Sequence, residues 1–318
     1  IYILCNFVST STWVFFLFTV DFWPMLVITA FYGMFYAPII SFLEAITMDV
    51  LGTEKKSYGR IRAWGSISFI VMVIVIGKII DLYAVDIILV LILAGSLMLS
   101  VISFRLPAIE APKKGFLTPG AGFLFEKRVI IFLFCAFLML ISHGAYYGFF
   151  SIHLENLGYH STFIGLSWAL ASTAEILVMV KSDRIFNRFS LENVIFFSFL
   201  VAAVRWIVLF FSESAANILL SQILHSVNYG TFHMASILYI DRLAPDNAKT
   251  LGQAVNNGLT YGLGLMAGFF INGYIYETTG SFVLFLISSL IALAGGLFFQ
   301  SYQLASRRRD KTVGAKPH

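Results

Sequence analysis

The chain has 318 residues, of which 59% are hydrophobic and only 12% are charged, and its formal net charge is +4. Soluble domains carry about 25% charged residues. This composition therefore excludes an ordinary soluble domain and indicates a protein whose apolar surface lies in lipid.

Apolar stretches long enough to span a bilayer, about 20 residues each, recur along the whole chain. Glycine and proline inside them do not argue against helices, because membrane helices tolerate both. The sequence therefore predicts an all-α, polytopic membrane protein with about ten helices, at residues 1–20, 23–50, 63–83, 86–105, 129–152, 161–182, 191–211, 215–240, 251–275 and 281–304.

Basic residues occur in every second turn. The turns around 54–62, 105–128, 181–190 and 241–250 and the tail 305–318 hold 4, 5, 3, 2 and 5 Lys or Arg residues, and the intervening turns hold none. An excess of Lys and Arg marks cytoplasmic loops. We therefore expect a multi-pass protein of the cytoplasmic membrane with both ends of this chain in the cytoplasm. The arginines at 307–309 fit this juxtamembrane pattern better than a nucleic-acid surface.

The longest turn contains Pro107, Pro112 and Pro119 and several glycines, which is typical of a linker between two helical bundles. We expect an N-terminal bundle at 1–106, a cytoplasmic linker at 107–128 and a C-terminal six-helix bundle with a basic tail at 129–318.

Glycine pairs with a spacing of six open the third and ninth expected spans, at Gly59 and Gly65 and at Gly252 and Gly258. This repeated glycine spacing favours a chain built from two related halves, as in many transporters. Four spans precede the linker and six follow it, so the first half lacks two spans. Because Ile1 lies inside an apolar stretch, we expect this chain to be an N-terminally truncated fragment.

Ionisable groups deep in a membrane span are expensive and are functional candidates by default. Lys78 is adequately explained by snorkelling and by Asp81 one turn away. Glu44 and Arg62 lie nine residues on either side of position 53, so a helical hairpin would place them at one height, about 10 Å inside the turn. Such a pair either closes the cytoplasmic end or binds a polar substrate.

Arg205 and His225 form a second pair, ten residues on either side of position 215, near the middle of the bilayer. An arginine there cannot easily lose its proton and needs an anion, a dipole or water. Glu175 stands inside the sixth span without a sequence-local cation. Because desolvation disfavours the charged form of a carboxyl group, Glu175 is a candidate for binding and releasing a proton.

His143 and His233 are weaker candidates, because a single membrane histidine is more often an interhelical hydrogen-bond donor than a ligand. Aromatic residues in the same spans either line a cavity or pack the bundle: Tyr146, Tyr147, Trp168 and Trp206.

Small residues four apart, at Gly258–Gly262 and Gly264–Gly268, predict close helix packing. Cys5 and Cys135 lie inside apolar stretches and form no metal motif. The sequence contains no HExxH, GxSxG or GxxxxGK[ST] motif. We therefore expect no enzyme, no cofactor and no metal.

Several short motifs resemble one known family. Tyr58–Ser66 (YGRIRAWGS) is similar to the entry of the fifth helix in the phenylpropionate permease and lactose permease branches of the major facilitator superfamily. The second half resembles the phenylpropionate permease branch at similar intervals, in 143–149 (HGAYYGF), 157–159 (LGY), 164–168 (IGLSW), 174–176 (AEI), 204–206 (VRW), 222–225 (QILH) and 232–233 (FH).

The resemblance implies a twelve-helix fold of two six-helix bundles, with residue 1 near the start of the third helix. It also implies proton-driven solute uptake by alternating access. By analogy with lactose permease, Glu44 and Arg62 would bind the substrate and Phe69 would replace a sugar-stacking tryptophan. Glu175 would match a glutamate of the eighth helix.

The resemblance also pairs Arg205 with His225, but the lactose proton relay is incomplete here. A titratable glutamate three residues after the histidine is replaced by Asn228, and a lysine three residues before it is replaced by Gln222. This departure favours the phenylpropionate branch. Glu175 and Glu44 become the best candidates for proton coupling, with His225 tuning the polar network.

The sequence predicts a monomeric secondary active transporter that couples protons to the uptake of a small organic solute such as an aromatic carboxylate. The expected partners are the solute, protons and the lipid bilayer. The substrate-binding candidates are Glu44, Arg62, Phe69, His143, Tyr147, Trp168 and Arg205. An oligosaccharide or nucleoside symporter is the nearest alternative, and a non-transporting receptor or scaffold on a transporter fold is a second.

Overall fold

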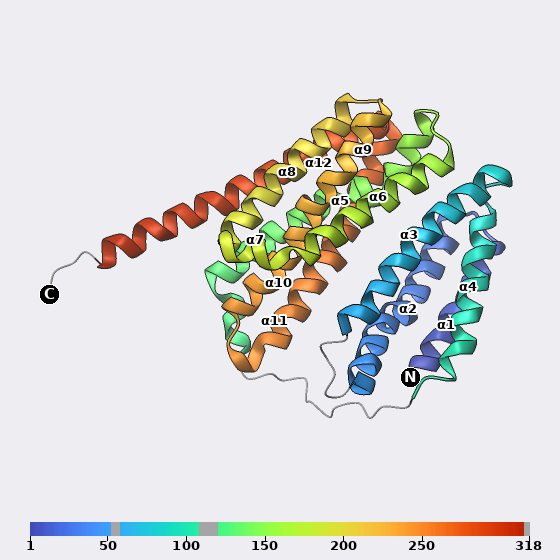
Figure 1. The fold of residues 1–318 in the computed structure, drawn as a ribbon, viewed down its shortest axis with the longest axis horizontal. Coiled ribbons are helices and arrows are strands. Elements are labelled where there is room, and N and C mark those ends of the chain that lie inside the picture. Colours follow the sequence, from blue (N-terminus) through green and yellow to red (C-terminus); the bar gives the residue numbers. More distant parts are fainter. Residues whose placement is uncertain (52–57, 108–119, 315–318) are drawn as a thin grey trace. The chain divides into compact units, whose positions relative to one another are not determined.

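The computed structural model describes residues 1–51, 58–107 and 120–314, and it divides the chain into two compact units, Ile1–Lys114 and Gly115–His318. The described residues are helical nearly throughout and contain no β-strand. Each expected span coincides with a helical segment, which confirms the all-α, polytopic fold (Figure 1).

The N-terminal unit contains the helices α1 (Tyr2–Trp13), α2 (Phe22–Leu51), α3 (Tyr58–Leu82) and α4 (Ile87–Ser103), and the short 3-10 helix η1 (Val14–Leu17) extends α1. Polar side chains join α1 to α4, because the Thr10 hydroxyl lies 2.9 Å from the Ser100 hydroxyl and the Trp13 indole N–H donates to the Leu89 carbonyl at 3.0 Å. Many large apolar side chains are exposed, among them Phe18 and Trp23, as expected of helices that face lipid.

The C-terminal unit begins with the 3-10 helix η3 (Ala121–Phe125) and the helices α5 (Lys127–Asn156), α6 (Ser161–Val180), α7 (Ser182–Arg188) and α8 (Leu191–Phe211). The rest of the unit comprises α9 (Ala215–His225), the π-helix η4 (Ser226–Thr231), α10 (Phe232–Leu243), the 3-10 helix η5 (Asp246–Ala248), α11 (Lys249–Asn256), the π-helix η6 (Asn257–Gly264) and α12 (Leu265–Gly314).

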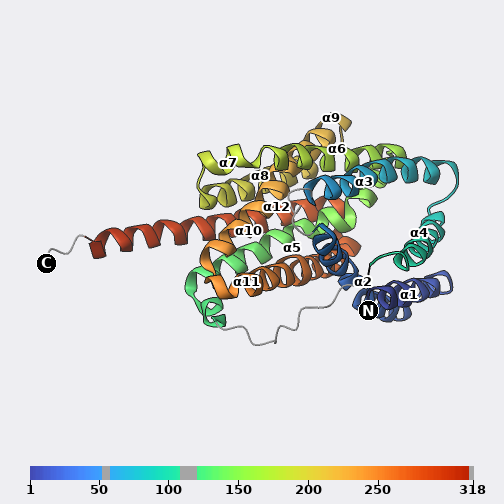
Figure 2. The ribbon, with the colours of Figure 1, turned by 60° about the horizontal axis from the view of Figure 1, so that its bottom comes forward.

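Two of the expected spans differ from regular α-helices. The span at 215–240 is α9, η4 and α10 in one continuous path, and the span at 251–275 contains η6 (Figure 2). α12 covers the end of the span expected at 251–275 and the whole span expected at 281–304, and the two are separated at Gly280, where φ is 75°. The short helix α7 was not predicted, because the polar residues at 181–190 indicate a turn.

Length and composition identify five candidate membrane spans among the described helices, at Phe22–Ile40, Lys127–Asn156, Ser161–Val180, Leu191–Phe211 and Leu251–Arg307. The last of these is 57 residues long and contains the break at Gly280. Tyr2–Leu17 and Ile87–Ser103 are shorter apolar helices.

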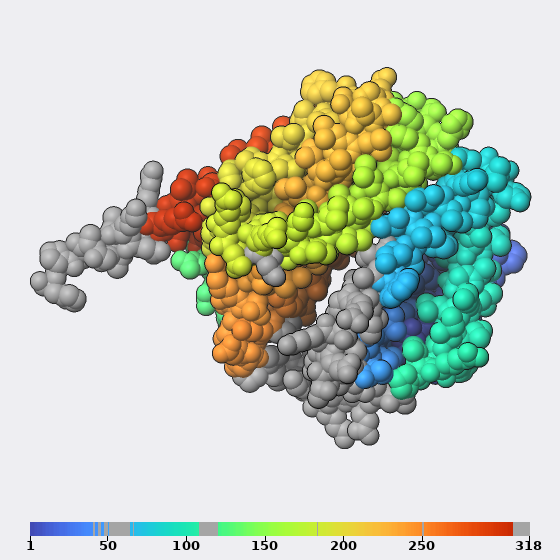
Figure 3. All heavy atoms as spheres, viewed as in Figure 1, coloured from blue at the N-terminus to red at the C-terminus, as the bar shows by residue number. Residues whose placement is uncertain are grey.

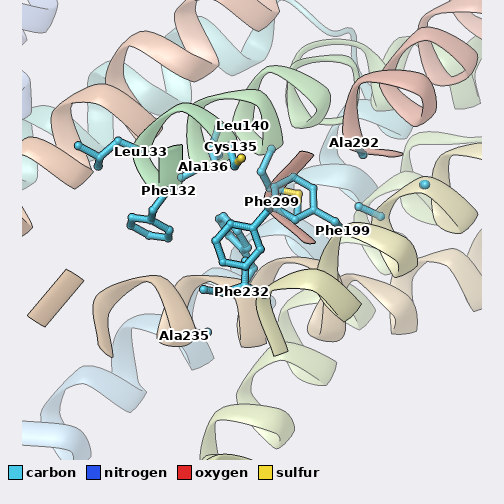
Figure 4. Packing of buried hydrophobic residues seen from close by; sticks show 14 of the residues in the cluster. Phe132, Leu133, Cys135, Ala136, Leu140, Phe199, Phe232, Ala235, Ala292 and Phe299 are labelled. Carbon is cyan, nitrogen blue, oxygen red and sulfur yellow. The ribbon is translucent and has the colours of Figure 1, made fainter. Parts of the chain in front are cut away.

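The core of the C-terminal unit lies where α5, α8, α10 and α12 meet. Figure 4 shows Phe199, Phe232 and Phe299 close together, and the rings of Phe199 and Phe232 are 5.7 Å apart. Trp206 also belongs to this core and is fully buried, so it packs the bundle instead of lining an open cavity.

Glycine contacts bring α5 together with η6 and α12 more closely than side chains would permit. A Cβ atom added at Gly144 would lie 2.5 Å from the backbone of Gly268, and one at Gly264 would lie 3.1 Å from the Leu140 side chain. The expected packing role of Gly264–Gly268 is thus confirmed. For Gly258–Gly262 it was wrong, because an added Cβ would meet no atom within 4 Å at Gly258 and only a carbonyl oxygen of the same helix at 4.0 Å at Gly262.

Candidate functional site

Polar and aromatic side chains gather inside the C-terminal unit, in two layers contributed by α5, α6, α8, α9, η4, α10 and η6. The inner layer is buried and consists of His143, Tyr146, Arg205, Gln222, His225 and Asn228. The outer layer is partly exposed and consists of Tyr147, Trp168, Glu175, Tyr229, His233 and Tyr261.

Arg205 is the centre of the inner layer and is 0% exposed. Its guanidinium donates to the Ser221 carbonyl at 2.7 Å, to His225 Nδ1 at 3.1 Å and to Gln222 Oε1 at 3.3 Å. The Arg205–His225 pairing predicted from their equal distance to the turn is confirmed. Because His225 Nδ1 accepts this hydrogen bond, the imidazole is neutral.

Two aromatic faces complete the surroundings of Arg205. Its guanidinium carbon lies 4.0 Å from the ring centre of Tyr146 and 4.5 Å from that of Trp206. Among the described residues, no carboxylate is paired with Arg205. The buried positive charge is therefore balanced by dipoles and π faces, which stabilise a cation less completely than an anion would.

Gln222 and Asn228 occupy the positions where the resemblance leads one to expect a lysine and a glutamate. Gln222 Oε1 accepts from the Tyr146 hydroxyl at 2.7 Å as well as from Arg205. Asn228 Nδ2 donates to His143 Nε2 at 3.2 Å, while His143 Nδ1 donates to the Met139 carbonyl at 2.8 Å. His143 is therefore neutral too, and these two amides hold the inner layer in a single arrangement.

Three rings form a stack along α9, η4 and α10. The rings of His225 and Tyr229 are 5.0 Å apart and inclined by 12°, and those of Tyr229 and His233 are 6.2 Å apart and inclined by 6°. His233 Nδ1 then shares a hydrogen bond of 2.6 Å with the hydroxyl of Tyr261 in η6. The stack thus connects the Arg205 cluster to the neighbouring helical path.

Glu175 lies on α6 against the backbone of η4. A Cβ atom added at Gly230 would lie 3.1 Å from Glu175 Cγ, so this glycine makes room for the acidic side chain. The carboxyl group is close enough to Tyr147, Tyr229 and Tyr261 to interact with them electrostatically. Within the described part of the chain Glu175 has no ion pair.

The aromatic part of the outer layer is preorganised. Tyr147 and Trp168 lie with their rings 6.1 Å apart and inclined by 21°, and the Trp168 indole N–H donates to the Ser151 hydroxyl at 3.1 Å. Tyr147, Trp168 and Glu175 are all partly exposed. They can contact a planar solute while the cation lies beneath them.

The remaining expected site residues belong to the N-terminal unit. Phe69 lies on α3 and is 46% exposed. The side chains of Glu44 and Arg62 lie outside the described residues. We found no group of three or more His, Cys, Asp or Glu residues suited to a metal ion within the described ranges.

Sequence reasoning missed Tyr229 and Tyr261. Tyr229 stands four residues after His225 and four before His233, a spacing that places side chains on one helical face and so was a usable signal. Tyr261 comes from a different span, and no local pattern indicates its contact with His233.

Comparisons with known proteins agree on one family. The model of the MFS_1 like family matches residues 1–287. The chain is 27% identical over 275 residues to the probable 3-phenylpropionic acid transporter of Escherichia coli strain K12. This alignment covers 85% of this chain and 72% of that protein. It is 23% identical over 293 residues to the maltose permease of Geobacillus stearothermophilus, over 91% of this chain and 73% of that protein.

A solved structure shows the same fold. The crystal structure of the nucleoside transporter NupG matches with a TM-score of 0.82 at 18% sequence identity, over 94% of this chain and 81% of that chain.

Proposed function

As a member of the MFS_1 like family this chain is a multi-pass membrane transporter and not an enzyme, and we propose that it couples the movement of protons to the uptake of a small organic solute, with an aromatic carboxylate as the preferred class. We further propose that it acts as a monomer in the cytoplasmic membrane, with both ends of this chain in the cytoplasm, as the alternation of basic turns favours.

The observation that carries the proposal is the unbalanced charge of Arg205. This cation is buried beneath aromatic side chains and has no carboxylate partner among the described residues. A solute carboxylate near the outer layer would experience its positive potential, because the low dielectric of the interior weakens charges much less than water does. Arg205 would therefore act through Tyr146, Gln222 and His225 instead of touching the solute in this conformation.

The outer layer supports an aromatic solute. Tyr147 and Trp168 are partly exposed and their rings are inclined by 21°, and offset stacking of an aromatic solute on such rings is worth about 1 kcal/mol beyond the burial of area. His143 fixes the inner edge of this surface through its contact with the Tyr147 ring at 6.1 Å. Phe69, Glu44 and Arg62 remain proposed substrate residues of the N-terminal unit.

Glu175 is the proposed proton carrier of the C-terminal unit. Its aliphatic stem packs on Gly230, and its carboxyl group interacts electrostatically with Tyr229. Among the described residues it forms no ion pair with a cation. Arrival of a solute or of water would change the surroundings of this carboxyl group and therefore its affinity for a proton. His225 tunes the network through Arg205, and Glu44 is a second proposed carrier.

Uptake of radiolabelled 3-phenylpropionate, maltose and uridine by cells that express the gene for this protein tests the proposal. The proposal expects accumulation of 3-phenylpropionate that a protonophore abolishes. Accumulation of 3-phenylpropionate that persists with the protonophore would reject proton coupling. Preferential uptake of maltose or uridine would favour the alternative suggested by the maltose permease and nucleoside transporter relatives. A lack of uptake of all three would favour a receptor or scaffold.

A further inference from the structure

An apolar groove lies on the C-terminal unit and shares none of its lining residues with the two polar layers. It has a volume of about 480 Å³. α6, α7, α8 and η4 contribute its lining, which consists of Val178, Ile185, Phe189, Asn193, Val194, Phe196, Phe197, Leu200, Val227 and Thr231. The yellow-green band in Figure 3 contains α6 and α7, which lie on the surface of this unit.

The chemistry of the lining suits a hydrocarbon chain. Eight of the ten lining residues are aliphatic or aromatic. The Thr231 hydroxyl is already hydrogen-bonded to the Ser198 hydroxyl and to the Val227 carbonyl, so it offers little to a polar ligand. The volume lies within the range of about 300–1,000 Å³ that small-ligand sites occupy, which suits one chain of one lipid and not a protein partner.

The rim of the groove carries positive charge. Arg188 places its guanidinium carbon 5.7 Å from the ring centre of Phe189, which lines the groove. Arg184 is exposed on α7 and directly precedes the lining residue Ile185. The segment 181–188 holds three basic residues and one acidic residue. Glu192, at the start of α8, is paired with Arg242 and so does not cancel this charge.

We propose that this groove binds one acyl chain of an anionic phospholipid whose phosphate contacts Arg184 and Arg188. An apolar slot on a membrane-spanning helix bundle takes the chain, and arginine supplies the planar donors that bind a phosphate with two hydrogen bonds. Clusters of basic residues at the end of a membrane helix bind anionic headgroups for the same reason.

The groove also touches the polar site from behind. Val227 and Thr231 line it, and both belong to η4, which supplies Asn228 and Tyr229 to the two layers on its other side. A bound acyl chain would therefore pack directly on the π-helix and restrain it. This contact gives the lipid a second observable effect, slower hydrogen exchange of η4.

Native mass spectrometry of the purified full chain in detergent tests the proposal, with dioleoyl phosphatidylglycerol as the probe and dioleoyl phosphatidylcholine as the neutral lipid. We expect one saturable phosphatidylglycerol adduct, with binding of phosphatidylcholine at least tenfold weaker. Each basic residue near an anionic headgroup contributes about fivefold. Arg184→Gln with Arg188→Gln should therefore weaken phosphatidylglycerol binding by about 25-fold.

Two further variants make the test specific. Leu200→Trp fills the groove and should remove the adduct without touching the basic rim. Lys127→Gln with Arg128→Gln changes the net charge equally at the start of α5 and should retain the adduct. Hydrogen exchange of residues 226–231 should slow on adding phosphatidylglycerol to the parent chain and not to the Leu200→Trp variant.

Three results would overturn the proposal. Equal binding of both lipids would remove the headgroup contact. Adducts that survive Leu200→Trp would place the lipid outside the groove. A loss of phosphatidylglycerol binding in the variant at 127 and 128 as large as that in the variant at 184 and 188 would show that binding follows the net charge of the protein and not a local headgroup contact. If Leu200→Trp does not fold, the exposed arginine pair and its matched control still decide the outcome.

Discussion

Replacement of Arg205 by methionine separates a functional cation from a structural one. Methionine keeps much of the length of the side chain and removes its charge and donors. Because the groups around Arg205 are a carbonyl, an amide oxygen, a neutral imidazole and two rings, its removal leaves no opposite charge unpaired. This differs from breaking a buried ion pair, which strands a charge at a cost of about 3–5 kcal/mol.

The opposing energies of this substitution nearly cancel. His225 Nδ1 loses its donor, at about 1–3 kcal/mol, the Ser221 carbonyl loses the Arg205 Nε–H donor, at about 1 kcal/mol, and each ring contact loses about 1–2 kcal/mol. Gln222 Oε1 keeps the Tyr146 hydroxyl at 2.7 Å. The variant also no longer carries the desolvation cost of a buried guanidinium, which is several kcal/mol. We therefore expect the free energy of unfolding to change by less than about 2 kcal/mol, and the melting temperature by less than about 8 °C.

Transport should nevertheless be lost, because the positive potential beneath the aromatic layer disappears. Thermal unfolding in detergent and uptake of 3-phenylpropionate by cells measure the two effects on the same variant. Trp206→Ala is the matched control. Trp206 is next to Arg205 in the sequence and is also fully buried, and truncating its side chain should lower the free energy of unfolding by about 3–5 kcal/mol. A loss of stability in Arg205→Met as large as that of Trp206→Ala, or uptake equal to that of the parent, would refute the reasoning.

Three other predictions concern single residues. Glu175→Gln should abolish protonophore-sensitive accumulation and leave solute exchange across proteoliposomes intact, and loss of both activities would assign Glu175 to solute binding. Gly144→Ala should lower the free energy of unfolding by about 1–3 kcal/mol, measured by thermal unfolding, because the added Cβ would lie 2.5 Å from the backbone of Gly268. Gly258→Ala is the control and should leave the stability unchanged, because its Cβ would meet no atom within 4 Å. Tyr146→Phe should cost about 1 kcal/mol by removing the hydrogen bond to Gln222, and an unchanged melting temperature would contradict this.

Most of the fold could be predicted because lipid imposes strong constraints on sequence. A span needs about 20 apolar residues, so the boundaries follow from polar turns. The Arg205–His225 contact could be predicted as well, because residues equally far from one turn lie at one height in a hairpin. This reasoning compares only two helices that follow each other, and it says nothing about contacts such as His233–Tyr261.

The remaining features depend on packing that no local pattern reveals. The segment 226–231 contains no proline and a single glycine, and nothing in it distinguishes a π-helix from an α-helix. The glycines at 258 and 264 look equivalent, yet only Gly264 faces α5 closely. The groove beside α7 could not be predicted, because it forms between segments that are separated in the sequence by up to about fifty residues.

The π-helix η4 has a consequence for comparing this chain with its relatives. A π-helix uses wider turns than an α-helix and is equivalent to a local insertion. Deleting one residue between Ser226 and Thr231 would allow a regular α-helix in which the residues that follow keep approximately the face they now occupy. An alignment that opens a one-residue gap in this stretch therefore pairs residues on the same face, whereas an ungapped alignment with a relative that has a regular α-helix here shifts the positions after η4 by about 100°.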